Sequence, residues 1–377
     1  MAALHHLVFP ADSGTPLFAP RRAAQSLLFL ALVAIAADAG GAVIYSVTDL
    51  GAGSDNVWGG FAPAINNLGQ VVGNYTGSDG NQHAVLISGG VRTDLGDLAS
   101  NGSAAKHIND HGQVVGESGS EAVLWTAPGV VQDLGSFNGM DINNAGQVVG
   151  GTRGYTAAAV LWSAGTITQI GAAGSLATAI NDSGQIVGTA GIGGGNHPFI
   201  LSGGATDLGT LGGGSFGWAL DVNNSGNIVG WCQNSSGYYR AFLSVGGGPL
   251  EDLGTLGGNQ AIAKAINSSG IIVGLAETGI VIPPPAGPEY VPEAFISDNG
   301  GPMQNLNGLI DTASGWTITD ATDINDLGQI VGYGTMAGLQ QADYVLLTPI
   351  STPEPSTLAL LAAALLGLAV CSLRRSR

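Results

Sequence analysis

A nine-residue motif recurs along this chain and constrains its fold more than any other feature. It reads Ile-Asn-Asp-Ser-Gly-Gln-Ile-Val-Gly over residues 180–188. Close copies begin at Ile65, Ile108, Ile142, Val222, Ile266 and Ile324. Seven such copies indicate a repeat protein, in which each unit buries its apolar surface against its neighbours. We therefore expect one repeated architecture, although 377 residues could form two or three separate domains.

The centre of the motif predicts a tight hairpin turn. Asn and Asp side chains hydrogen-bond their own backbone, and glycine adopts the positive φ that such a turn requires. We expect a positive φ at all seven turn glycines. They are Gly69, Gly112, Gly146, Gly184, Gly226, Gly270 and Gly328.

Each unit carries three further landmarks besides the nonapeptide. The first is a residue triplet such as His83-Ala84-Val85, the second is Asp-Leu-Gly or a relic of it, and the third is a glycine-rich connector. A mean period of about 43 residues suits a four-stranded unit. In the fourth unit, strands are expected at residues 177–181, 185–190, 198–202 and 205–208.

The apolar pattern decides how these sheets pack. Ile186 and Val187 are adjacent, so in a strand they point to opposite faces, and both faces must be buried. In a sandwich whose sheets each have one solvent-exposed face, apolar and polar residues would alternate along a strand. Stacked propeller blades bury both faces of each sheet. We therefore predict an all-β fold, a seven-bladed β-propeller of four-stranded repeats over residues 43–348.

The order of the landmarks predicts how the ring closes. The first Asp-Leu-Gly, at Asp49, precedes the first nonapeptide, and the last unit has a third strand near Tyr344 but no Asp-Leu-Gly after it. Residues 45–50 are therefore predicted to be the fourth strand of the last blade, which leaves few exposed edges. Residues 280–290, which contain three successive prolines, are expected to form a surface excursion because proline cannot donate to a ladder.

Charge and cysteine content exclude several classes of protein. The formal charge is −17, and residues 40–353 hold 24 acidic against 5 basic residues, so nucleic acid is excluded as a partner. The two cysteines are Cys232 in the body and Cys371 in the C-terminal tail. The body must therefore be stabilised by packing, without an internal disulfide.

The first 39 residues are typical of a signal peptide. Arg21 and Arg22 precede an apolar run over residues 27–37, and Ala37 and Ala39 form a small-x-small cleavage site. An uncleaved membrane anchor is the alternative. Its apolar run is shorter than the roughly 17 to 25 residues of a spanning helix.

Residues 352–377 have the three parts of a sorting tail. An apolar run that could form a transmembrane helix covers residues 357–373. Basic residues after it would stay in the cytoplasm. A permanent C-terminal anchor is the alternative to a tail that is processed. The residues of the sorting motif are Pro353, Glu354, Pro355 and Ser356 before the run and Arg374, Arg375 and Arg377 after it.

Two resemblances add to this interpretation. The tail, with Pro353 to Ser356, its apolar segment and its basic end, closely resembles the PEP-CTERM tail, also called the ice-binding protein C-terminal domain. That resemblance implies export, transient membrane anchoring, processing by an exosortase-type peptidase and release to the cell surface. The body, with triplets such as His83-Ala84-Val85 and Arg240-Ala241-Phe242, resembles the extracellular HAF-repeat family. Neither resemblance implies catalytic residues.

No catalytic, cofactor or metal residues are predicted. Asp110, Asp182 and Asp326 put carboxylates in turns, but the spacing of a calcium loop is absent. The histidines belong to different repeats and lack ligand spacing, so they are expected at polar surface positions. Cys232 is expected to be a buried small hydrophobe. The histidines considered are His83, His107, His111 and His197.

Aromatic residues in the connectors leave two interpretations open. Trp58, Phe61, Phe216 and Trp218 could pack between blades, or they could stack on sugar rings of a neutral ligand. We expect an exported, non-enzymatic binding or structural module, with extracellular polysaccharide as a possible partner. The alternative is a secreted propeller hydrolase or lyase on polysaccharide, which would need two or more carboxyl groups converging at one site.

Overall fold

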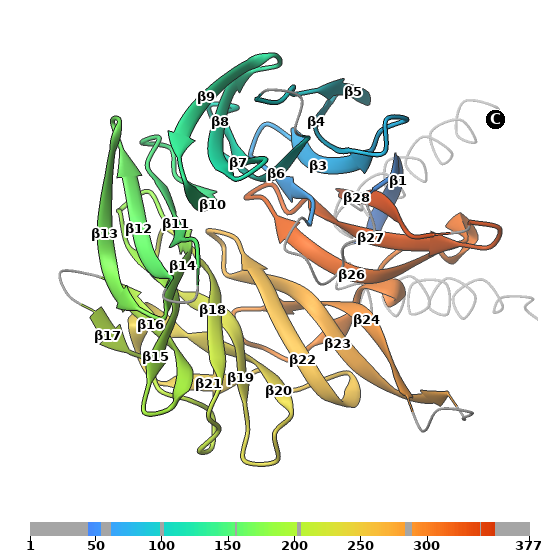
Figure 1. Ribbon diagram of the computed structural model, residues 1–377. Coiled ribbons are helices and arrows are strands. Elements are labelled where there is room, and N and C mark those ends of the chain that lie inside the picture. Colours follow the sequence, from blue (N-terminus) through green and yellow to red (C-terminus); the bar gives the residue numbers. More distant parts are fainter. Residues whose placement is uncertain are drawn as a thin grey trace, which may run out of the picture. The chain divides into compact units, whose positions relative to one another are not determined.

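The computed structural model describes residues 44–350, except residues 54–61, 99–101, 155–156, 202–204, 283–288 and 340. Within this part of the chain, 28 strands form seven four-stranded antiparallel sheets, which are arranged as blades around one axis (Figure 1). The predicted seven-bladed β-propeller is confirmed. Helical structure in the described residues is limited to the 3-10 turns η1 (Val245–Gly247), η2 (Leu306–Gly308) and η3 (Thr312–Ser314).

Each blade is numbered by its order along the chain, and its strands are given from the axis outward. Blade 1 contains β2 (Ala64–Ile65), β3 (Val71–Thr76), β4 (Gln82–Ser88) and β5 (Val91–Asp94). Blade 2 contains β6 (Ser103–Ile108), β7 (Val114–Ser118), β8 (Glu121–Ala127) and β9 (Val130–Gly135). Blade 3 contains β10 (Phe137–Ile142), β11 (Val148–Thr152), β12 (Ala158–Ser163) and β13 (Thr166–Ala173).

The remaining blades follow the same plan, except that the outer strand of blade 7 comes from the start of the body. Blade 4 contains β14 (Ser175–Ile180), β15 (Ile186–Ile192), β16 (Gly195–Leu201) and β17 (Ala205–Asp207). Blade 5 contains β18 (Gly217–Val222), β19 (Ile228–Gln233), β20 (Tyr239–Ser244) and β21 (Leu250–Asp252). Blade 6 contains β22 (Gly257–Ile266), β23 (Ile271–Ile282), β24 (Glu289–Asp298) and β25 (Gln304–Asn305). Blade 7 contains β26 (Trp316–Ile324), β27 (Ile330–Met336), β28 (Asp343–Ile350) and β1 (Ile44–Ala52).

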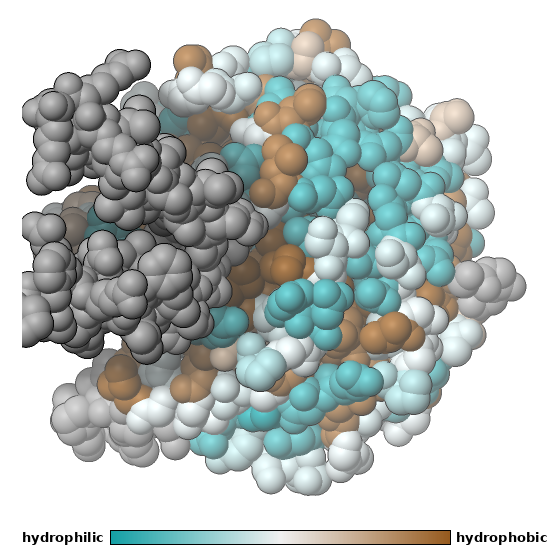
Figure 2. All heavy atoms as spheres, turned by 180° about the vertical axis from the view of Figure 1, so that it is seen from behind, coloured by the Kyte–Doolittle hydropathy of each residue, from teal (hydrophilic) through white to brown (hydrophobic). Residues whose placement is uncertain are grey.

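Adjacent apolar residues of the nonapeptide do point to opposite faces of a blade. Val148 and Val149 are both fully buried. Val148 packs with Val115 and other residues of blades 2 and 3, whereas Val149 packs with Phe199 and other residues of blades 3 and 4. The core is therefore a series of clusters in the seams between blades. On the face seen in Figure 2, hydrophilic and hydrophobic residues are interspersed.

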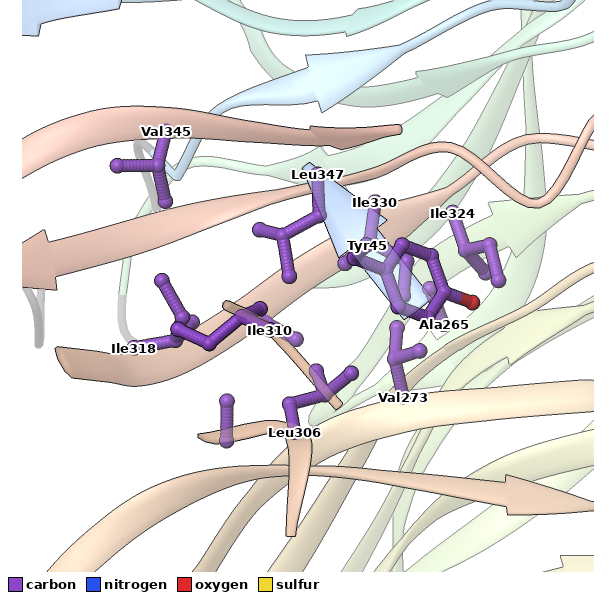
Figure 3. Close-up of a cluster of buried hydrophobic side chains, with 12 residues drawn as sticks. Tyr45, Ala265, Val273, Leu306, Ile310, Ile318, Ile324, Ile330, Val345 and Leu347 are labelled. Carbon is purple, nitrogen blue, oxygen red and sulfur yellow. The ribbon is translucent and has the colours of Figure 1, made fainter. Parts of the chain in front are cut away.

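The N-terminal strand closes the ring as predicted. β1 pairs with β28 along its whole length, from Ile44 opposite Ile350 to Ala52 opposite Asp343. The Tyr45 amide also donates to the Leu309 carbonyl at 2.8 Å. Its side chain is 4% exposed and lies among apolar residues of blades 6 and 7 (Figure 3). Strand pairing and side-chain burial thus fix β1 in the last blade.

The excursion predicted for residues 280–290 is smaller than expected. β23 and β24 continue their ladder out to Ile282 opposite Glu289, so both ends of this segment are paired strand. The residues before the prolines, Ile280 to Ile282, are β-branched and have amide donors, and they extend the hairpin. The prolines themselves lie outside the described residues.

Candidate functional site

The first Asn of each nonapeptide forms the turn that ends the inner strand. In blade 4, the Asn181 amide donates to the Gln185 carbonyl at 3.1 Å, and the Asn181 side-chain oxygen accepts from the Gln185 amide at 2.9 Å. Gly184 has a φ of 76°, and the other six turn glycines have φ between 71° and 84°. The expected positive φ is confirmed. The turn thus depends on an Asn side chain and on a residue free to adopt left-handed backbone.

The same seven Asn side chains link the blades into a closed ring. Each side-chain amide donates to the backbone carbonyl of the equivalent Asn in the next blade, at 2.9–3.1 Å. The last bond runs from Asn325 of blade 7 to Asn66 of blade 1 and completes the circle. All seven side chains are buried. The ring members are Asn66, Asn109, Asn143, Asn181, Asn223, Asn267 and Asn325.

A second ring is built from the next residue of each motif. At six seams its backbone amide donates to the side chain of the equivalent residue in the following blade, at 2.7–2.9 Å. Asn and Asp alternate around this ring, so no two carboxylates are neighbours. Because seven is odd, the alternation needs one exception, which is Ser268. The members are Asn67, Asp110, Asn144, Asp182, Asn224, Ser268 and Asp326.

The residue just before each motif faces the axis. In blades 2, 3, 5 and 7 this residue is His107, Asp141, Asp221 and Asp323, and in the other blades it is Ala. Two cavities of about 150 and 230 Å³ lie on the axis, and both are lined by His107 and the three aspartates. The first cavity is bounded by the Asn turns, and we call that side the turn end of the axis. The opposite side is the far end.

Each axial aspartate holds two blades together. Asp141 accepts from the amides of Ile142 in its own blade and Ile180 in blade 4, at 2.7 and 2.8 Å. Asp221 does the same for Val222 and Ile266, and Asp323 for Ile324 and Ile65. The Asp323 bond to Ile65 spans the seam between blades 7 and 1. Both oxygens of each carboxylate are therefore used in backbone hydrogen bonds.

His107 is the cation of this cluster. Its Nδ1 lies 2.6 Å from Asp141 Oδ1, its Nε2 lies 3.9 Å from Asp323 Oδ2, and 37% of its side chain is exposed. Burial alone would lower the pKa of His107, but Asp141, Asp323 and Asp221 outweigh burial and raise that pKa to about 10. The imidazole is thus protonated at neutral pH.

The carboxyl groups respond differently to the same surroundings. Burial raises the pKa of Asp221 to about 7, against the bond from the Ile266 amide, and the charges of Asp323 and Asp141 add to the rise. Burial also raises the pKa of Asp323. Burial opposes ionisation of Asp141 as well, but its ion pair with His107 keeps the pKa of Asp141 below the ordinary value. With a pKa of about 7, Asp221 exchanges a proton near neutral pH.

The far end of the axis differs from blade to blade. Lys264 Nζ pairs with Asp320 at 2.5 Å, and Lys106 pairs with Glu117. Thr178 and Thr322 donate across seams to the carbonyls of Ala219 and Pro63, both at 2.7 Å. The residues that line the cavity here, one from each blade, are Pro63, Lys106, Met140, Thr178, Leu220, Lys264 and Thr322.

The landmark residues predicted from the repeats meet at the outer edge of the blades. The third residue of the triplet lies opposite the Asp of Asp-Leu-Gly in the strand register. In three blades the residue that opens the triplet contacts the same Asp, with a nitrogen–oxygen distance of 3.1 Å. The same Asp also accepts from the amide of its own glycine, at 2.6–2.9 Å. These landmarks hold the outer strand. These contacts are His83 with Asp94, His197 with Asp207 and Arg240 with Asp252.

Of the histidines, His107 was wrongly expected at a polar surface position. It lies on the axis because its inner strand turns that position toward the cavity. Aligning the repeats one residue upstream of the motif would have placed His107 beside Asp141, Asp221 and Asp323. His111 is exposed, as expected. In the part of the chain that the structure describes, no group of three or more His, Cys, Asp or Glu side chains is arranged to hold a metal ion.

The remaining candidate residues fall into three groups. Cys232 is fully buried, as expected, and burial raises its pKa to about 12. Trp218 is half-buried and Phe216 is 42% exposed, while Trp58 and Phe61 lie outside the described residues. The predicted signal peptide, with Ala37 and Ala39, and the sorting tail also lie outside them. No helix among the residues described is both long and apolar enough to cross a membrane.

Solved structures match this chain at low identity. A gluconolactonase from Xanthomonas campestris matches at 11% identity and a TM-score of 0.41, over 83% of this chain and 93% of that one. A puromycin-hydrolyzing peptidase from Mycobacterium tuberculosis matches at 13% identity and a TM-score of 0.49, over 77% of this chain and 52% of that one. TolB from Acinetobacter baumannii matches at 12% identity and a TM-score of 0.39, over 64% of this chain and 52% of that one. The chain thus spans about half the length of the last two proteins.

The C-terminal tail gives the one family match. No curated protein matches the sequence. Residues 351–375 match the PEP-CTERM protein-sorting motif, which confirms the resemblance of the tail. The resemblance of the body to the HAF-repeat family stays a prediction. Because the motif directs export and membrane association, this chain is an exported protein built on a seven-bladed propeller.

Proposed function

We propose that this protein is a non-enzymatic binding or structural module of the cell surface or extracellular matrix. The sorting motif supports the location, and the closed ring supports a rigid scaffold. The observation that carries the proposal is the use of the axial carboxylates. Although three of them converge, as an enzyme would require, each one binds two backbone amides across a blade seam.

The charge state of the axis supports the same conclusion. A histidine with a pKa of about 10 is already protonated at neutral pH, so His107 is not available as a general base. Its positive charge instead offsets the charge of Asp141 and Asp323, which would otherwise repel each other in a buried site. In this proposal the axial polar groups determine the arrangement of the blades.

We further propose that the tail anchors the exported chain in a membrane and is then cleaved by an exosortase-type peptidase. Pro353 and Pro355 would keep the backbone before the apolar run extended and accessible. Mass spectrometry of the surface-exposed protein tests this step. A C-terminus near Pro353 to Ser356 is expected, and an intact Arg377 would contradict processing.

A second candidate function is a polysaccharide hydrolase or lyase, and one observation favours it. The pKa of Asp221 is about 7, which is suited to proton transfer, and this carboxyl lines both axial cavities. Purified exported protein should be incubated with neutral and uronic acid polysaccharides while reducing ends and unsaturated sugars are measured. The binding module predicts no products. Products that Asp221→Asn abolishes in a folded variant would establish the enzyme and overturn the proposal.

A further inference from the structure

Blade 5 carries an aromatic strip that the repeat plan does not require. Trp218 of β18 lies directly opposite Trp231 of β19, and their ring centroids are 6.4 Å apart with planes at 14°. Tyr239 of β20 continues the strip, with its ring centroid 4.6 Å from that of Trp231. Three neighbouring strands thus contribute one aromatic side chain each.

This strip reaches the surface. The exposed large hydrophobic residues of the described chain include three aromatic ones, Phe216, Tyr238 and Tyr239, and all three belong to blade 5 or its flanking turns. They are 42%, 41% and 37% exposed. Aromatic side chains bury large areas when they can, so a group left exposed at one place marks a binding surface.

Comparison with the other repeats shows that the strip is not part of the scaffold. At the positions of Trp218 and Trp231, no other blade with both residues described has two aromatic side chains. The fold is therefore satisfied without them. The equivalent pairs are Ala104 with Glu117, Asn138 with Gly151, Leu176 with Thr189, Ile262 with Leu275 and Asp320 with Tyr333.

The groups around the strip are uncharged or already paired. The turn between β19 and β20 covers residues 234–238, and its polar side chains are those of Asn234, Ser235 and Ser236. Arg240, next to Tyr239, binds Asp252 with its guanidinium and also donates to the Asn259 carbonyl. An aromatic surface edged by amides and hydroxyls fits a ligand with apolar C–H faces and many hydroxyls.

From this arrangement we infer that the aromatic strip of blade 5 binds a neutral polysaccharide. Sugar rings stack their C–H faces on Trp231 and Tyr239, and their hydroxyls meet the polar turn. Charge favours a neutral polymer, because the surrounding body has 24 acidic and only 5 basic residues and repels polyanions. The strip is separate from the axial cavities, so this inference names a surface and a ligand class beyond the proposed axial scaffold.

Affinity electrophoresis of the exported protein tests the inference. The gels contain one of four soluble neutral polysaccharides, namely hydroxyethylcellulose, a β-1,3-glucan, dextran and galactomannan, or anionic alginate. At least one neutral polymer should retard the protein, and alginate should not. Trp231→Ala and Tyr239→Ala should each weaken that binding about tenfold or more, which corresponds to 1.4 kcal/mol. Tyr239 is exposed, so its variant keeps the test valid if Trp231→Ala fails to fold.

Leu275→Ala is the matched control, because Leu275 occupies the position of Trp231 in blade 6. It should leave retardation unchanged. No retardation by any neutral polymer, equal retardation by alginate, or retardation unaffected by Tyr239→Ala would overturn the inference. Self-association that Tyr239→Ala abolishes would also overturn it, by assigning the strip to a second copy of the chain. If the non-enzymatic proposal is wrong, the separate incubation with polysaccharides would show cleavage products, whatever the result of the electrophoresis.

Discussion

The two ends of the propeller axis contrast sharply, although the same inner strands build both. At the turn end every blade contributes the same Asn with the same bond to its neighbour. At the far end the equivalent positions hold two lysines, two threonines, Met140, Leu220 and Pro63. The difference separates the residues that the fold requires from those that it leaves free to vary.

The regular end is the part of the molecule that determines the number and closure of the blades. Side chains that satisfy buried backbone groups are costly to replace, because each loss leaves a polar group unpaired. The irregular end and the aromatic strip of blade 5 have no such constraint from the repeat. Ligand chemistry is therefore expected where repeats differ, and scaffold chemistry where they agree.

Removing the closing strand should have the largest effect on this arrangement. Deletion of residues 43–51 takes away the outer strand of blade 7 and the buried Tyr45 and Leu50 side chains. Large buried side chains contribute about 2–5 kcal/mol each, against a total stability of about 5–15 kcal/mol. We expect no cooperative transition in denaturant. A melting curve like that of the intact protein would contradict closure by β1.

Raising the pH should weaken the axis through His107. Its folded-state pKa of about 10 lies above the ordinary 6.5, so its stabilising contribution is full below pH 6.5 and is lost as pH rises through 10. Thermal unfolding between pH 7 and 10.5 should show a falling melting temperature. His107→Gln should lower the melting temperature at pH 7 and flatten this slope. Parallel curves for the two proteins would contradict an ion pair at the axis.

Substituting a turn glycine should have a smaller effect of conformational origin. Gly184 has a φ of 76°, and a Cβ there would meet no atom within 4 Å, so Gly184→Val should cost roughly 1–2 kcal/mol through backbone strain alone. Gly308 has equal space without a positive φ, and Gly308→Val is the control. Urea titration measures the loss of unfolding free energy in each of the two variants. Equal losses would mean that strain at Gly184 is not the cause.

The sequence predicts the fold well because its signals are local and repeated. The Asn-x-x-Gly turn, the paired apolar residues and the position of Asp49 lead to the blade, its buried faces and its closing strand. In the fourth unit the expected strand starting at residue 198 begins earlier, at Gly195, because β15 and β16 continue their ladder to Ile192 opposite Gly195. Local signals do not show where a ladder stops.

The axial site was harder to predict because its members come from four different blades. His107, Asp141, Asp221 and Asp323 are between 34 and 216 residues apart and share no motif of their own. Their common position relative to the nonapeptide was the available signal. The aromatic strip was predicted in part, since Trp218 was a candidate, whereas Trp231 and Tyr239 join it only through strand register.

The central claim is that the nonapeptide Asn links neighbouring blades in addition to forming its own turn. Asn234, in the turn between β19 and β20, provides a matched comparison. It makes the same local turn, accepting from the Ser236 and Tyr238 amides at 2.9 and 3.1 Å, but it lies at a solvent-facing hairpin. Asn181 additionally donates to the buried Asn223 carbonyl at 2.9 Å.

Denaturant unfolding of Asn181→Ala and Asn234→Ala, measured side by side, therefore tests the link between blades. Both variants lose the side-chain bonds of a turn, but Asn181→Ala also removes the bond to the buried Asn223 carbonyl. That carbonyl keeps its bond from the Gly226 amide, so the additional loss is that of one hydrogen bond, about 0.5–1.5 kcal/mol. We predict that Asn181→Ala is less stable than Asn234→Ala by that amount. Equal losses of unfolding free energy in the two variants would contradict a ring held together at its axis.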